Sequence, residues 1–537
     1  MPKFIFVTGG VVSSLGKGIA TSSIGLLIKR HGYPVKPLKL DPYLNVDPGT
    51  MNPFQHGEVF VTDDGAETDL DLGHYERFLN QNLSRKNNAT AGQIYESLIK
   101  KEREGYFLGK TVQVVPHLTD EIKLRINELV EHEKDVIIVE IGGTVGDIES
   151  LPFLEAIRQM RLEYGEGNTL FIHVTLVPYI KSIGELKTKP TQHSVMKLRE
   201  IGIQPDLIIC RSEKKIGTEI REKISLFTNV PRERVVEMRD LPTIYQAPLI
   251  LHREKVDLNI LKKLNLSPSP EVDLSDWDSF VNTLLKLREK VKIGIVGKYV
   301  DVKDSYKSIS EAFVHASVSN NVKVDLKYID SEKLEEIQDI TEEFADVDGI
   351  LVPGGFGYRG IEGKIRAIKF ARENRIPFFG ICLGMQLASI EFARNVLGLK
   401  GANSTEFVPD TEHPVITILP EKRNLKRLGG TLRKGAYPAI LKPGTLTFEI
   451  YGHVREISER HRHRYEFNPV YREMFEKNGM IVAGESPDGY LVEIIELKSH
   501  PFFIGVQFHP EFKSRPMNPH PIFHHFVKAA KNRRYGK

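Results

Sequence analysis

Cysteine is scarce in this sequence, which has only Cys210 and Cys382 among its 537 residues. A disulfide framework needs several paired cysteines and a thiolate zinc site needs closely spaced ones, so both are excluded. A large excess of one charge is also missing, because 74 basic and 71 acidic residues leave a formal net charge of +3. That balance argues against a protein whose main partner is a nucleic acid.

Long hydrophobic runs are absent as well. No window approaches the ~18 consecutive apolar residues of a membrane-spanning helix. The opening residues, MPKFIFVTGG, lack the basic start and the cleavage site of a signal peptide. We therefore expect a cytoplasmic protein with no membrane partner. The 27% of charged and 40% of hydrophobic residues are typical of a globular chain with a sizeable core, divided into two large domains or about three to four smaller ones.

Short apolar segments and amphipathic segments alternate through the first half of the chain. Strands separated by helices in this way predict a parallel, doubly wound α/β sheet. The expected helices include 93–104, 120–130 and 149–163. The expected strands are 4–8, 35–40, 112–115, 135–141, 170–177, 207–210 and 235–238.

A second alternating series follows the segment 266–278, which contains prolines and acidic residues but no periodicity. Its expected strands are 291–297, 349–352 and 377–381, and further apolar runs follow at 415–419, 481–484 and 502–506. The sequence therefore predicts two doubly wound α/β domains, 1–265 and 291–537, joined by a linker at 266–290.

A glycine-rich loop, Thr8-Gly-Gly-Val-Val-Ser-Ser-Leu-Gly-Lys-Gly18, joins the first strand to a helix. Its backbone N–H groups and the helix N-terminus suit a phosphate, and Lys17 is placed like a P-loop lysine. The loop departs from the standard motif because Gly18 replaces the metal-binding hydroxyl. Any magnesium ion must then be held by carboxylates elsewhere. The alternative is a tight strand–helix turn with a surface lysine.

Suitable carboxylates occur at two places. Residues 63–71 (DDGAETDLD) form an acidic cluster, and Glu140 ends the apolar strand DVIIVE. A carboxylate at the end of a strand beside a phosphate loop is a typical magnesium ligand. For the acidic cluster alone, a solvated loop is an equal alternative.

Residues 187–192 (KTKPTQ) place two lysines before a helix that Pro190 could start. Cations beside a helix N-terminus suit a second polyanion. Taken alone, the pattern is more typical of a charged surface turn.

The segment Gly380-Ile-Cys382-Leu-Gly384 has the pattern of a nucleophile elbow, in which glycines relieve crowding around a cysteine at a strand–helix turn. With an ordinary thiol pKa of about 8.5, the cysteine needs a base. His509 could be that base and Glu511 could orient it. The N–H groups of the Gly354–Gly355 pair and of Leu383 could form an oxyanion hole. The alternative is a buried structural cysteine.

Residues 461–464 read His-Arg-His-Arg. The alternating arginines oppose a bound cation, so we expect a basic substrate-facing or surface loop rather than a metal site.

Longer motifs add a family resemblance. PGGFG at 353–357, GICLGMQ at 380–386 and QFHPE at 507–511 resemble class I glutamine amidotransferases. VTGGVVSSLGKGI, TDLDLGHYERF, EIGGTVGDIES and KTKPTQHSV, in this order in the first domain, resemble the CTP synthase family. The resemblance implies a P-loop-type, Rossmann-like amidoligase domain followed by an amidotransferase domain with an α/β-hydrolase-like elbow.

The resemblance also implies a reaction. Cys382 would form a glutamyl thioester and release ammonia, while Mg-ATP phosphorylates the uracil carbonyl oxygen of UTP. Ammonia would then displace phosphate to give CTP, the last step of de novo CTP synthesis.

The family's functional residues carry over by motif. Cys382, His509 and Glu511 would be catalytic, and Asp71 and Glu140 would bind Mg²⁺. ATP would contact Ser14, Leu15, Gly16, Lys17, Gly18, Ile19, Asp71, Arg239, Asp240 and Leu241. UTP or inhibitory CTP would contact Ser13, Asp147, Ile148, Glu149, Lys187, Thr188, Lys189, Pro190, Thr191, Gln192 and Lys223. Glutamine would contact Gly355, Leu383, Gly384, Met385, Gln386, Glu406 and Arg464.

The family further implies activation by GTP, feedback inhibition by CTP, an internal ammonia tunnel and a homotetramer. Three alternatives stay open: a P-loop amidoligase with another acceptor, a bare glutaminase and a non-catalytic scaffold. The motifs KTKPTQHSV and TDLDLGHYERF argue against the first. The second leaves the first domain unexplained, and the filled catalytic positions argue against the third.

Overall fold

The computed structural model describes residues 1–51, 57–298, 303–418 and 432–536. The chain divides into two compact units, one containing Met1–Met51 and Glu67–Val281 and the other containing Asn52–Ala66 and Asn282–Lys537. Residues 57–66, from the N-terminal part of the sequence, thus fold with the C-terminal unit. Within the described ranges, no helix combines the length and the hydropathy needed to cross a membrane.

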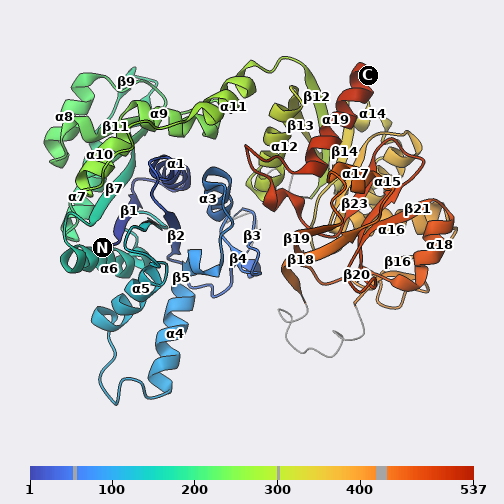
Figure 1. Cartoon of the computed structure of the whole chain (residues 1–537), viewed down its shortest axis with the longest axis horizontal. Helices are drawn as coiled ribbons and strands as arrows, with labels where there is room; N and C mark the ends of the chain where they lie inside the picture. The colour runs from blue at the N-terminus through green and yellow to red at the C-terminus, as the bar shows by residue number, and fades with distance from the viewer. Residues whose placement is uncertain (52–56, 299–302, 419–431, 537) are drawn as a thin grey trace. The chain divides into compact units, whose positions relative to one another are not determined.

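The first unit is built on a seven-stranded sheet in which every strand pair is parallel (Figure 1). The strands are, in spatial order, β11 (Val235–Arg239), β10 (Leu207–Ser212), β7 (Thr169–Leu176), β1 (Lys3–Gly9), β6 (Val136–Ile141), β2 (Val35–Asp41) and β5 (Asn88–Thr90). Nearly all of their residues are buried, because helices cover both faces of a doubly wound sheet.

Helices α4 (Ala91–Arg103), α5 (Thr119–Asn127) and α6 (Leu151–Tyr164) pack on the face that carries Phe4 and Phe6 of β1. On the opposite face, Gly25 of α1 lies against Val35 and Ile138. The other elements of this unit are α1 (Lys17–Arg30), β4 (Glu67–Thr68), α3 (Asp71–Leu79), β8 (Tyr179–Ile180), β9 (Glu185–Leu186), α7 (Lys189–Glu200), α8 (Thr218–Thr228), α9 (Ala247–Arg253) and α10 (Val256–Lys263). Helix α11 (Ser275–Lys286) begins in this unit, which ends at Val281.

The second unit contains a nine-stranded sheet with a parallel and an antiparallel half. The parallel half runs β13 (Lys323–Asp330), β12 (Lys290–Gly297), β14 (Gly349–Val352), β15 (Phe378–Ile381) and β23 (Phe503–Val506). The antiparallel half continues with β22 (Val492–Leu497), β21 (Met480–Glu485), β18 (Arg433–Leu441) and β19 (Glu456–His463). The predicted pair of α/β domains is confirmed, and the antiparallel half is an addition to it.

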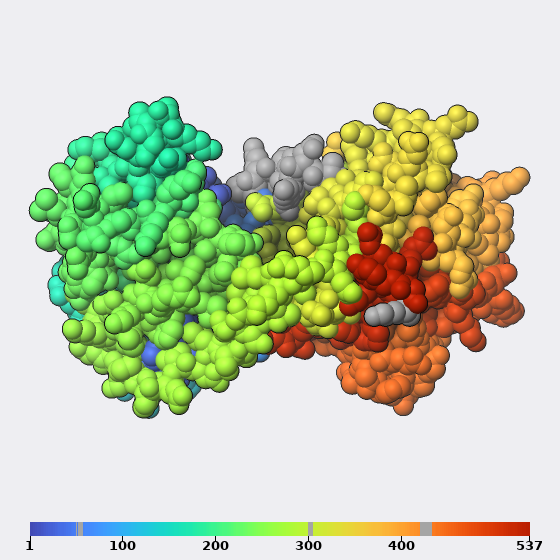
Figure 2. Space-filling view, turned by 90° about the horizontal axis from the view of Figure 1, so that it is seen from above, coloured from blue at the N-terminus to red at the C-terminus, as the bar shows by residue number. Residues whose placement is uncertain are grey.

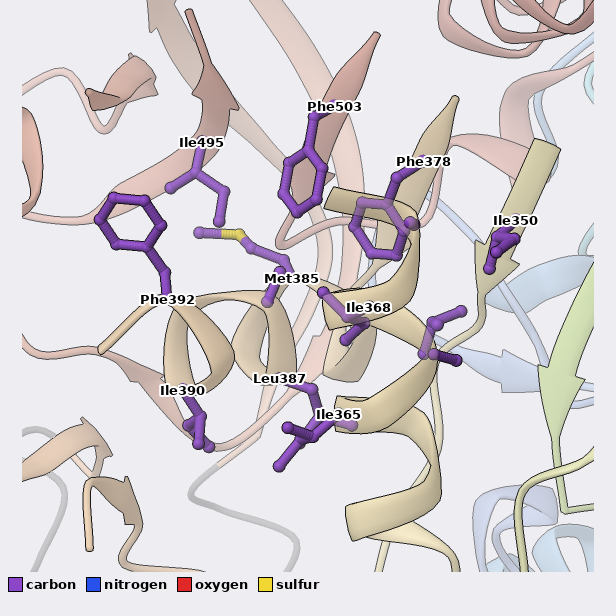
Figure 3. Close-up of a cluster of buried hydrophobic side chains, with 14 of the residues drawn as sticks. Ile350, Ile365, Ile368, Phe378, Met385, Leu387, Ile390, Phe392, Ile495 and Phe503 are labelled. Atoms are coloured by element: carbon purple, nitrogen blue, oxygen red, sulfur yellow. The ribbon is translucent and has the colours of Figure 1, made fainter. Parts of the chain in front are cut away.

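Helices cover both faces of the parallel half. Figure 3 shows Ile368 of α15 (Ile361–Glu373) and Met385 of α16 (Leu383–Asn395) packed against Phe378 and Phe503 of the sheet, with Ile365 beside Leu387 in the same cluster. Helices α12 (Lys307–Ser319) and α19 (Pro521–Tyr535) pack on the other face. The other elements of this unit are β3 (Phe60–Val61), α13 (Ser331–Glu336), α14 (Thr341–Phe344), β16 (Asn403–Ser404), β17 (Pro414–Thr417), α17 (Leu446–Ile450), β20 (Glu466–Phe467) and α18 (Arg472–Lys477). Figure 2 shows the last turns of α19, in dark red, at the surface of this unit.

One local prediction is wrong. Residues 112–115, expected as a strand, are mostly exposed and lead into an irregular helical turn, η3 (Val114–Leu118). Pro116 explains this, because it cannot donate a ladder hydrogen bond. The segment 266–278, expected as part of the linker, contains the start of α11. Trp277 anchors that helix, since it is buried and its Nε1 donates to the Tyr245 carbonyl at 2.7 Å. Leu419, the last residue of the apolar run 415–419, lies outside the described residues.

Candidate active sites

The phosphate loop lies at the carboxyl edge of the first sheet, between the end of β1 and the start of α1. Gly16 has φ +90°, and Ser14 also lies in the left-handed region with φ +57°. Lys17 is half-buried, and its Nζ donates to the Gly143 carbonyl at 2.5 Å. Burial lowers the pKa of Lys17. This lysine thus points inward at the sheet edge and is not a surface lysine on a simple turn.

Gly10 brings the phosphate loop against α7, since a Cβ at this position would lie 1.6 Å from Ser194 Oγ. Buried His173 links the two elements, because its Nδ1 bonds Thr8 Oγ1 at 2.9 Å and its Nε2 bonds Ser194 Oγ at 2.7 Å. Burial, assisted by Lys17, lowers the pKa of His173 to about 3, so the ring is neutral. Sequence reasoning missed this link, whose only signal was a histidine inside an otherwise apolar strand.

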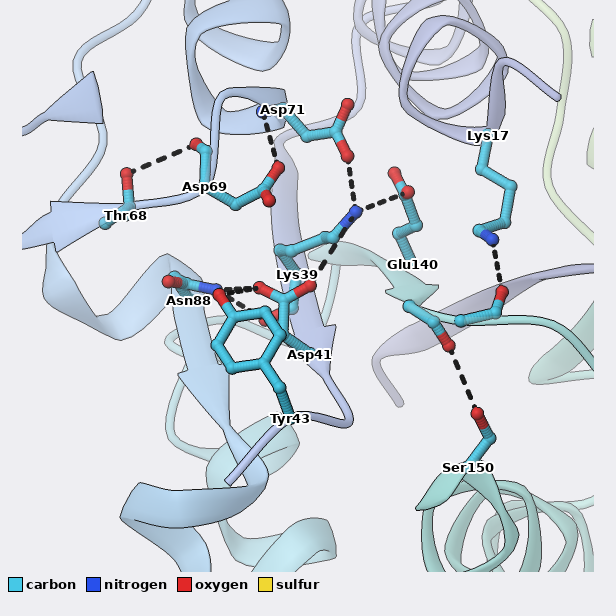
Figure 4. A network of polar contacts seen from close by, with 12 residues as sticks. Lys17, Lys39, Asp41, Tyr43, Thr68, Asp69, Asp71, Asn88, Glu140 and Ser150 are labelled. Atoms are coloured by element: carbon cyan, nitrogen blue, oxygen red, sulfur yellow. Dashed lines mark hydrogen bonds and ion pairs between the residues drawn. The ribbon is translucent and has the colours of Figure 1, made fainter. Parts of the chain in front are cut away.

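Three carboxylates surround Lys39 of β2 beside the phosphate loop (Figure 4). Lys39 Nζ contacts Asp71 Oδ2 and lies 2.8 Å from Glu140 Oε1 and 3.9 Å from Asp41 Oδ1. Burial would raise the pKa of Asp71, but Lys39 holds it at about 2. Burial and Asp71 raise the pKa of Glu140 against the opposing effects of Lys39 and Lys17.

Asp71 and Glu140 fit a shared magnesium ion, because both direct an oxygen to the same nitrogen of Lys39. Among the described residues, no group of three or more His, Cys, Asp or Glu side chains is arranged to hold a metal ion. Phosphate oxygens of a bound nucleotide would therefore have to complete the coordination.

Gly18 has a steric role that the sequence motif did not reveal. A Cβ on Gly18 would lie 2.0 Å from Asp71 Oδ1. The absence of a side chain thus makes room for the carboxylate, which lies where the usual serine or threonine would project. This explains the departure from the standard phosphate loop.

The acidic segment 63–71 is shared between the two units. Asp69 and Asp71 lie in the first unit, whereas Asp63 belongs to the second, where its Oδ1 accepts a hydrogen bond from Arg460 Nε at 2.5 Å.

A cavity of about 130 Å³ lies next to the phosphate loop. Its lining includes the predicted ATP contacts Leu15, Gly16, Ile19, Arg239, Asp240 and Leu241. Arg211, which sequence reasoning missed, also lines it and connects its two sides. Its Nη1 donates to the Ser14 carbonyl at 2.9 Å and its Nε donates to Asp240 Oδ1 at 3.0 Å.

The segment 187–192 leads into α7, whose first turn contains Pro190, as predicted. Lys187 pairs with Glu185 at 2.6 Å. Lys187 and, more weakly, Lys223 lower the pKa of that carboxyl, so both lysines face the same region. Thr188, buried at the start of the helix, accepts a hydrogen bond from Gln192 Nε2 at 2.9 Å.

The remaining predicted nucleotide contacts lie in exposed turns. Ser13 is an exposed residue of the phosphate loop. Asp147 precedes the short turn η4 (Ile148–Ser150), and its Oδ2 accepts the Thr144 N–H at 2.8 Å. Ile148 is 80% exposed, and Glu149 is exposed beside it.

In the second unit, Cys382 lies at a sharp turn between β15 and α16. Its φ of 52° and ψ of −102° are strained for a residue with a side chain. A Cβ on Gly384 would lie 2.1 Å from the Val352 carbonyl oxygen, and one on Gly380 would lie 2.7 Å from the backbone of Gly384. Both glycines are therefore required by the crowding at this turn, and the geometry is that of the elbow predicted for a nucleophilic cysteine.

His509 and Glu511 lie beside this elbow. His509 Nδ1 is 2.8 Å from Glu511 Oε1, and His509 Nε2 is buried with no hydrogen bond to another described residue. Burial would lower the pKa of His509, but Glu511 and Cys382 raise it to about 10. A Cβ on Gly354 would lie 2.7 Å from His509 Cε1 and 3.5 Å from Cys382 Cβ. The three catalytic candidates and the Gly354 backbone thus meet at one place.

The loop that carries Gly355 is held over the elbow by several contacts. The Gly357 N–H donates to Glu406 Oε1 at 3.2 Å, and the Arg462 guanidinium lies 5.1 Å from the centre of the Phe356 ring. Burial raises the pKa of Glu406 against the opposing effects of the Gly357 N–H and Arg464. Glu406 and Arg464, both predicted glutamine contacts, are therefore neighbours.

The first turn of α16 contains Leu383, Gly384, Met385 and Gln386. Gln386 Nε2 donates to the Tyr465 carbonyl at 2.9 Å. Met385 is fully buried with its side chain in the hydrophobic core (Figure 3). A glutamine contact of Met385 would therefore use its backbone only.

The expectation of a basic loop at 461–464 is wrong. His461 and His463 are buried in β19, and His461 Nδ1 lies 2.9 Å from His463 Nε2. Successive residues of a strand point to opposite faces, so the two histidines share one side, and the half-buried Arg462 points to the other.

Comparisons with known proteins find relatives of both parts of the chain. The family model "CTP synthase N-terminus" matches residues 3–266, and "Glutamine amidotransferase class-I" matches residues 301–529. The CTP synthase of Caldanaerobacter subterraneus subsp. tengcongensis is 59% identical over 533 residues, which cover 99% of each chain. That of Methanocaldococcus jannaschii is 58% identical over 533 residues, which cover 98% of each chain. Among solved structures, the Trypanosoma brucei CTPS glutaminase domain with bound acivicin is 40% identical over 45% of this chain and 94% of its own, with a TM-score of 0.43.

The two family models and the cysteine elbow define a glutamine-dependent ligase that carries its own amidotransferase. The two CTP synthases share more than half of their residues with this chain over nearly the whole length of both sequences. This match identifies the family more specifically than either domain model alone. The chain belongs to the CTP synthase family.

Proposed function

We propose that this protein converts UTP to CTP at the expense of ATP, with ammonia released from glutamine. Two observations support the proposal. One is the convergence of Cys382, His509 and Glu511 at a strained elbow in the second unit. The other is the phosphate loop with Lys17, Asp71 and Glu140 at one sheet edge of the first unit.

The glutaminase half-reaction uses the elbow. Cys382 Sγ attacks the amide carbon of glutamine, and the imidazolium of His509 gives its proton to the departing ammonia. The N–H groups of Leu383 and Gly355 stabilise the oxyanion. Glu406 and Arg464 bind the substrate's charged ends, and water then hydrolyses the thioester to glutamate.

The synthase half-reaction uses the first unit. The cavity lined by Leu15 and Asp240 takes the adenosine part of ATP, and Lys17 approaches the phosphates. Asp71 and Glu140 would hold Mg²⁺, which neutralises charge on the transferring phosphoryl group. UTP binds at Ser13, at the α7 N-terminal segment 187–192 and at Lys223. Its phosphorylated carbonyl oxygen leaves when ammonia attacks.

Further properties of the proposal rest on family membership. GTP activates the enzyme, CTP inhibits it through contacts that include the turn 147–149, and the working form is a cytoplasmic homotetramer with an internal ammonia tunnel. We also propose residues 1–265 as the amidoligase domain and 291–537 as the amidotransferase domain, joined by the segment 266–290.

The test is to incubate the purified protein with UTP, Mg-ATP and glutamine and to measure CTP, ADP and glutamate. Equimolar formation of all three, replacement of glutamine by ammonium, and loss of CTP on chelation of Mg²⁺ are expected. Consumption of ATP and glutamine with UTP unchanged would assign another acceptor. No turnover, even with GTP, would support the non-catalytic scaffold.

A further inference from the structure

Residues 57–66 are integrated into the second unit although their sequence lies within the region matched by the CTP synthase N-terminus model. The Asp63 carbonyl accepts the Ala436 N–H of β18 at 2.8 Å. The preceding Gly435 has φ +94°, and a Cβ there would lie 2.6 Å from the Asp63 carbonyl oxygen. Strand β18 is thus shaped to receive this segment closely.

The Asp63 side chain reaches His509 through one residue. Arg460 of β19 is fully buried, and its Nε donates to Asp63 Oδ1 at 2.5 Å. The carbonyl of the same Arg460 accepts the backbone N–H of His509 at 2.7 Å. The Asp63 carboxylate therefore helps to fix Arg460, and Arg460 in turn accepts the hydrogen bond of the His509 backbone.

A second route reaches the ring of His509. Phe60 is fully buried, and its ring meets that of Phe512 at 5.1 Å between centroids. Phe512 in turn stacks on the His509 ring at 5.2 Å with an interplanar angle of 16°. The Arg460 guanidinium lies 5.4 Å from the centre of the Phe60 ring, so the two routes are joined by a cation–π contact.

We propose that Phe60 and Asp63 are positioning residues for glutamine hydrolysis, which hold the backbone and ring of His509 through Arg460 and Phe512. The inference rests on the proposed role of His509 in the glutaminase reaction. It means that residues of the synthase part of the sequence prepare the amidotransferase site.

The physical reason is the buried charge of Arg460. Removing the charge of Asp63 reduces the compensation of that guanidinium, and the surrounding backbone must then adjust. A displacement of a catalytic base by about 1 Å costs on the order of 100-fold in rate. The effect should fall on hydrolysis itself rather than on glutamine binding, because neither Phe60 nor Asp63 is a glutamine contact.

The experiment compares Asp63→Asn with Asp64→Asn in the full chain. Asp64 is the exposed neighbour of Asp63, and its Oδ1 accepts a bond from Thr62 Oγ1, so its variant is a matched control. For Asp63→Asn we expect kcat for glutamate release to fall about 10- to 100-fold with KM for glutamine unchanged. Ammonia-dependent CTP synthesis should stay at the wild-type rate, and Asp63→Glu should recover part of the loss.

Phe60→Leu is a second variant, with the same direction expected and with ammonia-dependent synthesis as the check that the chain is folded. Three results would overturn the positioning role: equal glutamate release by the Asp63→Asn and Asp64→Asn variants, equal loss with both nitrogen sources, or a lower CTP yield per glutamate without slower glutamate release. If the wild-type protein itself releases no glutamate, the proposed function fails first. The two failures are therefore distinguishable.

Discussion

Glu511 Oε1 lies 2.8 Å from Nδ1 of His509, only two positions away in the sequence. Pro510 lies between them, at the start of the short turn η11 (Pro510–Lys513). This contact orients the ring and leaves Nε2 without a hydrogen bond to another described residue, as the proposed reaction with Cys382 requires. It also raises the pKa of His509, together with Cys382, to about 10 against the opposing effect of burial.

Glu511→Gln should therefore slow glutamine hydrolysis about 10²- to 10⁴-fold, the usual contribution of an acid–base group. Because His509 acts as the acid for ammonia release, activity should fall as pH rises through its pKa. The variant lacks the carboxylate that raises this pKa, so its alkaline limb should lie at lower pH than that of the wild type. A pH profile of glutamate release checks this. An unmoved alkaline limb would contradict the assignment.

Cys382→Ala should abolish glutamine-dependent CTP synthesis and leave synthesis from ammonia intact. The thiol is needed only for the thioester, whereas the phosphate loop and its carboxylates belong to the other unit. The measurement is CTP formation with each nitrogen source. Loss of both activities in a folded variant would show that the two half-reactions are not separable in this way.

Gly354→Ala should also stop glutamine hydrolysis, but for a steric reason. The new Cβ would lie 2.7 Å from His509 Cε1, so either the loop or the imidazole must move. Gly217→Ala is the control, because a Cβ there has no neighbour within 4 Å. Glutamate release should drop at least about 100-fold in the first variant and be unchanged in the second.

Gly18→Ser restores the hydroxyl of a standard phosphate loop, yet it should abolish CTP synthesis from either nitrogen source. A Cβ at this position would lie 2.0 Å from Asp71 Oδ1 and would displace that carboxylate. Glutamate release in the absence of nucleotides should persist. A Gly18→Ser variant with wild-type synthesis would contradict the role given to Asp71.

The sequence predicted those features that depend on local rules. Glycines around Cys382 are required by crowding at one turn, and the glycine-rich loop is required by one strand–helix connection, so both are visible as short motifs. The alternation of strands and helices predicted the seven-stranded sheet and the parallel half of the nine-stranded sheet, because burial on two faces leaves continuous apolar strands. It did not predict the antiparallel half.

Features that depend on distant partners could not be predicted. His461 and His463 look like part of a basic loop until their strand pairs with β18. His173 and Arg211 act through contacts with residues far away in the sequence. Asp63 belongs to the same acidic stretch of sequence as Asp69 and Asp71. Only the tertiary fold assigns Asp63 to the second unit and the other two to the first. In each case the sequence around the residue is ordinary, and its structural role follows from a contact with a residue that is distant in the sequence.

The discontinuity of the second unit has a consequence for protein engineering. A single cut near residue 281 does not separate the two units, because residues 57–66 stay with the other fragment. Consider a chimera that takes residues 282–537 from a relative and keeps residues 1–281 of this chain. In it, Phe60 and Asp63 of this chain would have to pack against the relative's residue at position 460 and its surroundings. Such chimeras should therefore hydrolyse glutamine poorly unless residues 52–66 and 282–537 are exchanged together. An exchange of the whole second unit then needs three crossover points, near residues 51, 66 and 281, rather than one.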